Sequence, residues 1–344
     1  MVIGQHYITH FQISNCLVFK LPTFATMITI PHKAKQFGVF IIKLLIVTTA
    51  FYFIYDQLAN NSALNWQKFT SLVNHKASIL GIVFLLTFSF VNRFLEILKW
   101  KNLVGSIKPI SIGEATKQVL ASMTAGIFTP NGLGEYAGKA LYFEKLKTKK
   151  IIFLNLICNG IQMILTIFFG TIGLFILGYW KWSLATTLLA FAFCLMAFLS
   201  KNIKIKGYSI QKLVHKINET PKQIHQKNIL FGTLRYLVFS HQYYFLFLSF
   251  DVDLPYLTMM ATIATVYFLA SSLPSFQFLD FAVKGSVAVF FFEKLGVNEW
   301  IVVFISTLMW FLNVVLPVAI GSYYVLTFRL NSTLCHTENI RSDK

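Results

Sequence analysis

The sequence predicts an all-α polytopic membrane protein with about six to eight transmembrane helices and two re-entrant or broken helical hairpins in an inverted repeat. Three observations support this fold class. First, 56% of the 344 residues are hydrophobic, only 12% are charged, and the mean hydropathy is +0.64, whereas a soluble protein carries about twice that charged fraction. Second, apolar runs of about twenty residues recur, which is the length that crosses a bilayer. Third, a helix-breaking, charge-bearing stretch occurs twice inside apolar sequence.

The chain divides into a transmembrane domain and two flanking segments. Residues 1–38 are expected to be a cytoplasmic segment without a cleaved signal peptide, and Met27 is an alternative start that would make residues 1–26 non-native. Residues 39–328 are expected to form one transmembrane domain. Residues 329–344 form a polar tail, which is expected in the cytoplasm.

Apolar runs separated by basic loops predict the spans and their orientation. The formal net charge is +17, and the lysines cluster in short loops, which is typical of topology determinants and anionic-lipid contacts rather than of nucleic-acid binding. The loop 201–228 carries seven lysines against Glu219 as its single acid, so it marks the cytoplasmic side. Trp100 and the segment Tyr179–Trp182 are expected at the membrane interfaces. The apolar runs that predict spans are 39–55, 78–98, 151–177, 184–199, 229–250 and 300–326.

The first break in an apolar region falls at residues 128–146. Pro130 ends the preceding helix, because it lacks an N–H and clashes with the previous turn. Gly132 and Gly134 permit the tight turn that follows. Glu135 then lies in the first turn of a new helix, where the helix dipole favours an acid, and Lys139 follows four residues later on the same face. Basic residues at both ends predict a re-entrant hairpin that opens from the cytoplasm.

A second, degraded copy of this break follows Pro274. There Asp280 and Lys284 repeat the spacing of acid and base, and both copies are followed by Phe-Glu-Lys-Leu, at 143–146 and at 292–295. The recurrence predicts a duplicated unit. Repeat A covers about 78–178 and repeat B about 229–327. The repeats run in opposite senses, an arrangement that places broken helices near the bilayer midplane; whether the second hairpin is re-entrant or a full span stays open.

Polar and ionisable side chains inside the spans are candidate functional residues. The two acid–base pairs are read either as structural ion pairs or as parts of an anion site. In the anion site, the helix N-terminus at 131–136 binds a lipid phosphate, with Lys139 or Arg93 as the countercharge. A polar stripe on the span 151–177 is favoured as interhelical hydrogen-bonding residues over cavity lining, and Arg235 is favoured as a side chain that snorkels to the cytoplasmic interface. The complete candidate site for headgroup binding or translocation comprises Arg93, Pro130, Asn131, Gly132, Gly134, Glu135, Lys139, Asn155, Asn159, Gln162, Arg235, Pro274, Asp280 and Lys284.

At the first break the sequence resembles the flippase-like transmembrane family of lysylphosphatidylglycerol synthases. The likeness covers roughly residues 30–328 and departs from the family at Asn131, where Gly is common, and at residues 275–279, where the second break has lost its glycines. No soluble acyltransferase domain follows the last span, so the resemblance implies lipid handling rather than aminoacyl transfer, in the inner membrane of a bacterium. The residues that carry the resemblance are Pro130, Gly132, Gly134, Glu135 and Lys139, with Arg93 followed by Trp100.

The function expected from these features is a lipid translocase or flippase-like carrier of an anionic or polyprenyl-linked lipid. The alternatives are a membrane partner or scaffold for a separate lipid-modifying synthase and, third, a membrane lipid transferase. Against an enzyme, the sequence has no His/Cys cluster and no nucleotide-binding Gly loop, and Asp251 and Asp253 share an Asp-x-Asp spacing only in a short outer loop. Four scattered cysteines without a CxxC predict no metal site, and no cofactor is expected. Membrane lipids are the expected partners, and the oligomeric state stays open.

Overall fold

The computed structural model describes residues 78–127, 129–130, 132–203, 209–273, 276 and 279–328, with isolated positions at 41, 45, 48 and 52. The N-terminal segment 1–38, the tail 329–344 and nearly all of the expected first span 39–55 lie outside the described residues, so the predictions made for them stand as predictions.

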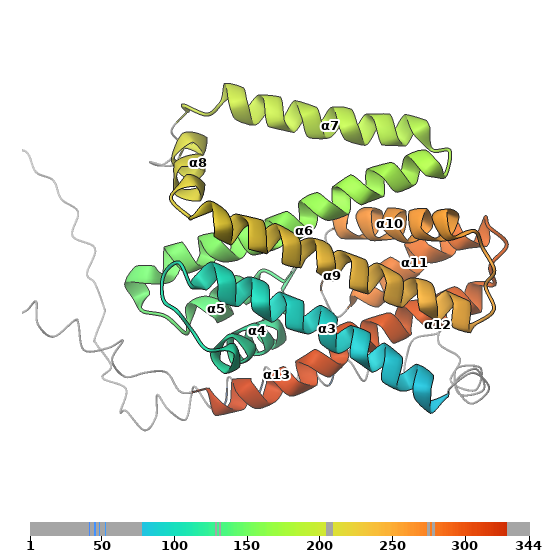
Figure 1. Ribbon diagram of the computed structural model, residues 1–344, viewed down its shortest axis with the longest axis horizontal. Coiled ribbons are helices and arrows are strands. Elements are labelled where there is room, and N and C mark those ends of the chain that lie inside the picture. The colour runs from blue at the N-terminus through green and yellow to red at the C-terminus, as the bar shows by residue number, and fades with distance from the viewer. Residues whose placement is uncertain are drawn as a thin grey trace, which may run out of the picture. The chain divides into compact units, whose positions relative to one another are not determined.

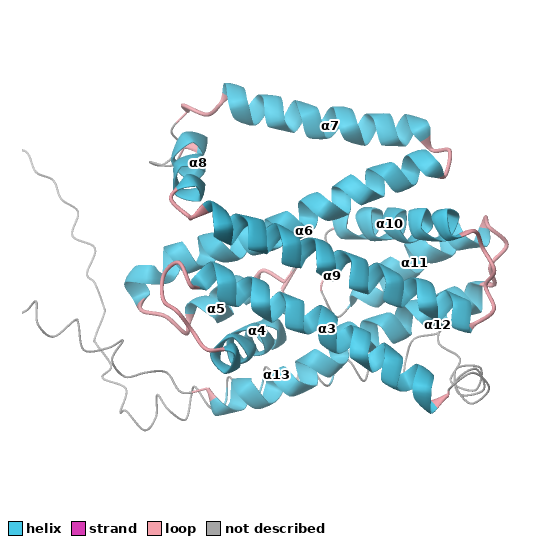
Figure 2. Cartoon of the chain, viewed as in Figure 1, coloured by secondary structure: helices cyan, strands magenta, loops and turns pink. Residues whose placement is uncertain are grey.

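The described part of the chain is helical throughout (Figures 1 and 2). Its elements are α3 (Ile79–Val104), α4 (Ile112–Gly126), α5 (Gly134–Ala140), the 3-10 turn η1 (Lys145–Lys147), α6 (Thr148–Ile176), α7 (Trp180–Leu199), α8 (Ile210–Asn218), α9 (Lys222–Ser249), α10 (Tyr256–Ser272), α11 (Asp280–Glu293), α12 (Glu299–Trp310), the π-helical turn η3 (Phe311–Val315) and α13 (Leu316–Thr327).

Four helical segments in the described residues are long and apolar enough to cross a membrane: α3, η1 with α6, α7, and α12 through α13. The all-α class and the membrane character expected from composition are therefore confirmed at this level. Helix α10 is apolar but shorter. The total of six to eight spans stays a prediction.

Three element predictions were wrong in extent. Helix α9 begins at Lys222, seven residues before the expected start at 229, because Pro221 ends the preceding turn and fits the start of a helix. Helix α8 lies within the stretch expected to be a loop, and its N-terminus is capped by the side chain of Ser209. Helix α5 is only seven residues long, shorter than the arm expected to run from 136 to 146.

The helices on either side of α8 pack in a reciprocal pattern. Helix α3 packs against α9, while α4 packs against α13 and α10 packs against α6. Exchanging α3 with α9, α4 with α10 and α6 with α13 leaves this set of contacts unchanged. Glycine allows the contact of α10 with α6 and that of α4 with α13. A Cβ on Gly173 of α6 would lie 2.5 Å from a carbonyl oxygen of α10, and a Cβ on Gly321 of α13 would lie 2.3 Å from a carbonyl oxygen of α4.

Buried side chains form one apolar cluster in each half and a third between them. The first cluster joins α3, α4 and α6, and the second joins α9 through α12. The third includes Met123 and Ile127 from the end of α4, Phe281 from α11 and Val318 from α13. The two halves are therefore joined by packing at the ends of the broken helices.

Helix α7 lies at the edge of the bundle, contacts α6 near the turn that connects them, and diverges from α6 toward α8 (Figure 1). Of its twenty residues only Ser183 is buried. Its exposed side chains are large and apolar, including Phe191 and Leu199. An apolar surface of this kind is stable against lipid chains and not against water.

Candidate functional site

The two breaks predicted from sequence meet in the structure. Pro130, between α4 and α5, forms an isolated antiparallel bridge with Phe276, between α10 and α11. The first turn is closed by Thr129, whose hydroxyl accepts from the Gly134 N–H at 2.7 Å and donates to a carbonyl of α4. Gly132 has φ +68°, a conformation that favours glycine. Asn131 and Pro274 lie outside the described residues.

Both predicted acid–base pairs form, in different surroundings. Lys139 Nζ lies 3.9 Å from Glu135 Oε2, is fully buried, and donates to Asn155 Oδ1 at 2.7 Å. Lys284 Nζ lies 2.5 Å from Asp280 Oδ2 with a quarter of its side chain exposed. Lys139 therefore faces inward to α6, whereas Lys284 lies at an open cavity.

That cavity has a volume of about 360 Å³. Each of α3, α4, α5 and α6 and each of α9, α10, α11 and η3 contributes at least one lining residue, so both halves of the chain build it. Its charged lining consists of Arg93, Glu135, Arg235, Asp280 and Lys284. The cavity thus contains five of the fourteen residues predicted for the site, and Gln162 is a sixth.

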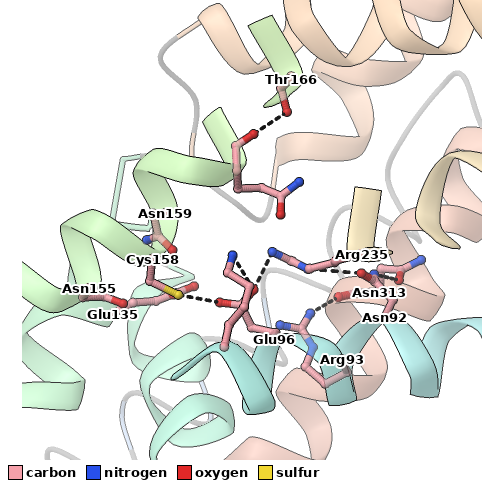
Figure 3. A network of polar contacts seen from close by, with 12 residues as sticks. Asn92, Arg93, Glu96, Glu135, Asn155, Cys158, Asn159, Thr166, Arg235 and Asn313 are labelled. Carbon is pink, nitrogen blue, oxygen red and sulfur yellow. Dashed lines mark hydrogen bonds and ion pairs between the residues drawn. The ribbon is translucent and has the colours of Figure 1, made fainter. Parts of the chain in front are cut away.

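Glu96 is the centre of a buried ionic network beside the cavity (Figure 3). Arg235 Nη1 lies 2.5 Å from Glu96 Oε2, and Lys99 Nζ lies 3.7 Å from the same oxygen. The Sγ of Cys158 donates weakly to the other oxygen at 3.8 Å. Glu96 is 4% exposed and Lys99 is fully buried. A carboxylate this deep requires a countercharge, because burying an unpaired charge is costly.

The expected snorkelling of Arg235 to the membrane interface is wrong. Because α9 begins at Lys222, Arg235 lies more than three turns inside the helix. Its guanidinium instead pairs with Glu96, and its Nε donates to Asn92 Oδ1 at 3.1 Å. Electrostatic attraction to the buried Glu96 carboxylate determines where the Arg235 side chain points.

Asn313, which the sequence analysis did not select, joins the two halves. Its Oδ1 accepts from Asn92 Nδ2 at 2.7 Å, its backbone carbonyl accepts from Arg93 Nη2 at 2.7 Å, and its Nδ2 donates to Gln242 Oε1 at 3.1 Å. It lies in the π-helical turn η3, and such turns often mark functional sites. One signal was present in the sequence: Asn313 is the only amide side chain in the apolar run 300–326.

The polar stripe on α6 divides between two roles. Asn155 accepts from Lys139, and Asn159 Nδ2 donates to the Tyr136 hydroxyl at 3.3 Å, so both residues connect α6 to α5. These contacts agree with the favoured reading as interhelical hydrogen bonds. Gln162 instead lines the cavity.

Trp100 was expected at the membrane interface, and this expectation is wrong. Its side chain is fully buried, its Nε1 donates to Gln118 Oε1 at 2.7 Å, and its ring lies 4.8 Å from Lys139 Nζ. The ring packs over a buried ammonium group, so the polar edge of the indole is satisfied inside the protein. Trp180 and Trp182, by contrast, are exposed as an interface position requires.

Three buried polar atoms on cavity-lining residues have no hydrogen-bond partner among the described residues. These atoms are Arg93 Nε, Gln162 Oε1 and Tyr236 OH. Buried polar atoms are usually satisfied in native proteins. Among the basic lining residues that the structure describes, Arg93 alone has no acid within 4 Å. Arg93 Nε and the Tyr236 hydroxyl can donate hydrogen bonds to a ligand in the cavity, and Gln162 Oε1 can accept one.

No family model matches the chain, and no curated protein matches it.

Proposed function

We propose that the chain is a lipid translocase, a flippase-like carrier for a lipid with an anionic headgroup. One observation carries the proposal: a polar cavity of about 360 Å³ is lined by charged residues from both breaks and lies inside a bundle of helices that expose large apolar side chains. Charges are rare inside membrane proteins and mark substrate pathways. Such a cavity shelters a headgroup while the acyl chains remain among apolar helices.

The reciprocal packing supports the further proposal of an inverted repeat. The cross-contacts of α4 with α13 and of α10 with α6 are those expected when two similar units exchange their last helices around a two-fold axis. The bridge between Pro130 and Phe276 then lies where the two breaks approach each other. In transporters of this kind the site lies near the midplane, and rocking of one unit against the other changes access.

The cavity residues have separate roles in this proposal. Arg93, Arg235 and Lys284 provide positive charge and N–H donors for a phosphate group. Glu135 pairs with Lys139 at 3.9 Å, and Asp280 pairs with Lys284 at 2.5 Å, so each acid positions the basic side chain four residues later. The loop charges support a cytoplasmic C-terminus and hairpins that enter from opposite sides. The resemblance noted at the first break is the basis for placing the protein in the inner membrane of a bacterium.

Reconstitution into liposomes tests the proposal. Full-length protein is incorporated into vesicles that contain fluorescent phosphatidylglycerol or a fluorescent polyprenyl phosphate, and dithionite reduction reports how much label moves between leaflets. The proposal requires transbilayer movement faster than in protein-free vesicles for at least one anionic lipid. Movement at the protein-free rate for every anionic lipid would overturn it.

Matched variants locate the activity in the cavity. Arg93→Gln and Lys284→Gln each remove a lining charge and are expected to slow lipid movement at least about tenfold, because charge-assisted contacts to phosphate are among the strong ones. Lys294→Gln removes an exposed lysine outside the cavity and is the control. Equal rates for all three variants and the unchanged protein would show that lipid movement does not use this cavity.

A further inference from the structure

The charges around the cavity do not balance. The charged cluster consists of the five charged lining residues and three buried residues behind them, Glu96, Lys99 and Lys139. It contains five basic and three acidic side chains, which leaves an excess of two positive charges when all are ionised.

The excess can be assigned to two places. Glu135 pairs with Lys139, and Asp280 pairs with Lys284, so these four charges cancel. Glu96 alone faces both Arg235 and Lys99, which leaves one positive charge on α3 and α9. Arg93 donates to a neutral carbonyl and forms no ion pair with a described acid, which leaves the second.

Both unbalanced charges lie at or beside the same cavity. Arg93 and Arg235 line it, and within the part of the chain that the structure describes Arg93 Nε and Tyr236 OH are buried there without hydrogen-bond partners. Lys99 Nζ, 3.7 Å from Glu96, likewise has no hydrogen bond to a described residue. Uncompensated positive charge in a site of low dielectric constant attracts anions strongly, and a second negative charge on the ligand adds to that attraction.

We infer that the cavity selects a dianionic phosphate, a lipid phosphomonoester or terminal diphosphate, over a phosphodiester headgroup with a single negative charge. This inference rests on the proposed function for its lipid source. The guanidinium groups of Arg93 and Arg235 suit phosphate oxygens, because their planar N–H groups match the geometry of the anion. A free phosphate dianion has the same chemistry, and the experiment separates the two sources.

The test measures binding rather than transport. Full-length protein in non-ionic detergent at pH 8 is titrated with dioleoyl phosphatidic acid, with dioleoyl phosphatidylmethanol and with inorganic phosphate, and binding is followed by native mass spectrometry and by thermal unfolding. Phosphatidylmethanol is the matched ligand, because one methyl group converts the monoester into a diester with one charge. We expect phosphatidic acid to bind at least about tenfold more tightly than phosphatidylmethanol.

Three variants test the assignment of the charges. Arg93→Gln removes one excess charge and is expected to reduce the preference for phosphatidic acid to about threefold or less, whereas Arg93→Lys keeps the charge and the preference. Lys99→Met removes the other excess charge without changing the cavity wall, and it is expected to reduce the preference as well. Lys294→Gln is expected to leave it unchanged.

The outcomes are distinct. Equal affinity for the two lipids in the unchanged protein would overturn the inference, and lipid movement in the liposome assay would then still support the proposed function. A preference that persists in Arg93→Gln and in Lys99→Met would also overturn it. Saturation by inorganic phosphate at the concentrations where phosphatidic acid binds would support the dianion site and identify a soluble ligand, which would contradict lipid transport through this cavity.

Discussion

Removing the buried carboxylate of Glu96 is expected to destabilise the protein far more than removing its neighbour Lys99. In Glu96→Gln, Arg235 and Lys99 both lose the only acid within 4 Å in the described chain. Breaking a buried ion pair by removing one partner costs about 3–5 kcal/mol. In Lys99→Met, the pair of Glu96 with Arg235 remains, and the lost ammonium group has no hydrogen bond to any described residue. Its removal also removes the cost of burying a charge, so the substitution is expected to be about neutral.

The comparison is measured as the free energy of unfolding of full-length protein in bicelles, by titration with a denaturing detergent. The two variants should differ by at least about 3 kcal/mol, or more than about a hundredfold in the unfolding equilibrium. Each changes one buried side chain on α3, so the difference reports charge rather than helix packing. Equal destabilisation, or a larger loss in Lys99→Met, would refute the conclusion that positive charge is in excess here.

Three further changes test the packing and capping of the fold. Gly321→Ala is expected to cost about 1–3 kcal/mol by overpacking the contact with α4, measured in the same unfolding titration. Gly160→Ala on α6 is the control, because nothing lies within 4 Å of a Cβ at that position. Trp100→Phe leaves the buried Gln118 Oε1 without its donor and should cost about 1–3 kcal/mol; a cost below 0.5 kcal/mol, roughly, would show that this bond is dispensable. Ser111→Ala removes the cap of α4 and should cost about 1 kcal/mol. The Ser111 N–H donates to the Glu114 carboxylate and lowers the pKa of Glu114 below its ordinary value of 4.5. This cap is therefore complete at neutral pH and weakens as the pH falls through the lowered pKa. Hydrogen exchange of the amides at the start of α4 measures the weakening.

Composition predicted the all-helical membrane class, and the local breaks predicted where α4 and α10 end. Pro130 and the glycines after it act through local backbone sterics, so their effect is visible in sequence. The spacing of four between Glu135 and Lys139, and between Asp280 and Lys284, likewise sets a contact on one helix face, and both contacts form.

The contacts between distant segments were not predictable in the same way. Arg235 was assigned to the interface from its distance to a basic loop, but a buried carboxylate 139 residues earlier in the chain determines where it points. Asn313 has no local motif, and its importance appears only when η3 lies beside α3. Lys139 was proposed as a ligand-facing charge, and the packing of α6 on α5 turns it toward Asn155 instead.

The two breaks meet at one cavity, and disulfide cross-linking between them tests this arrangement. The variant carries Pro130→Cys and Phe276→Cys, because residues paired across an antiparallel bridge have Cα atoms about 4.5–5.5 Å apart, within the range that a disulfide spans. A control pair combines Pro130→Cys with Lys294→Cys at the exposed C-terminal end of α11, so that its two cysteines also lie on opposite sides of a cut between α7 and α8. In both variants the native cysteines are replaced by serine; these are Cys16, Cys158, Cys194 and Cys335.

The protein is oxidised in its own membrane and then cut at a protease site inserted between α7 and α8. We expect the fragments of the 130/276 variant to stay joined on a non-reducing gel and to separate after reduction. The fragments of the control variant are expected to separate without reduction. Fragments of the 130/276 variant that separate without reduction, while the protein remains folded, would contradict the meeting of the two breaks and with it the shared cavity.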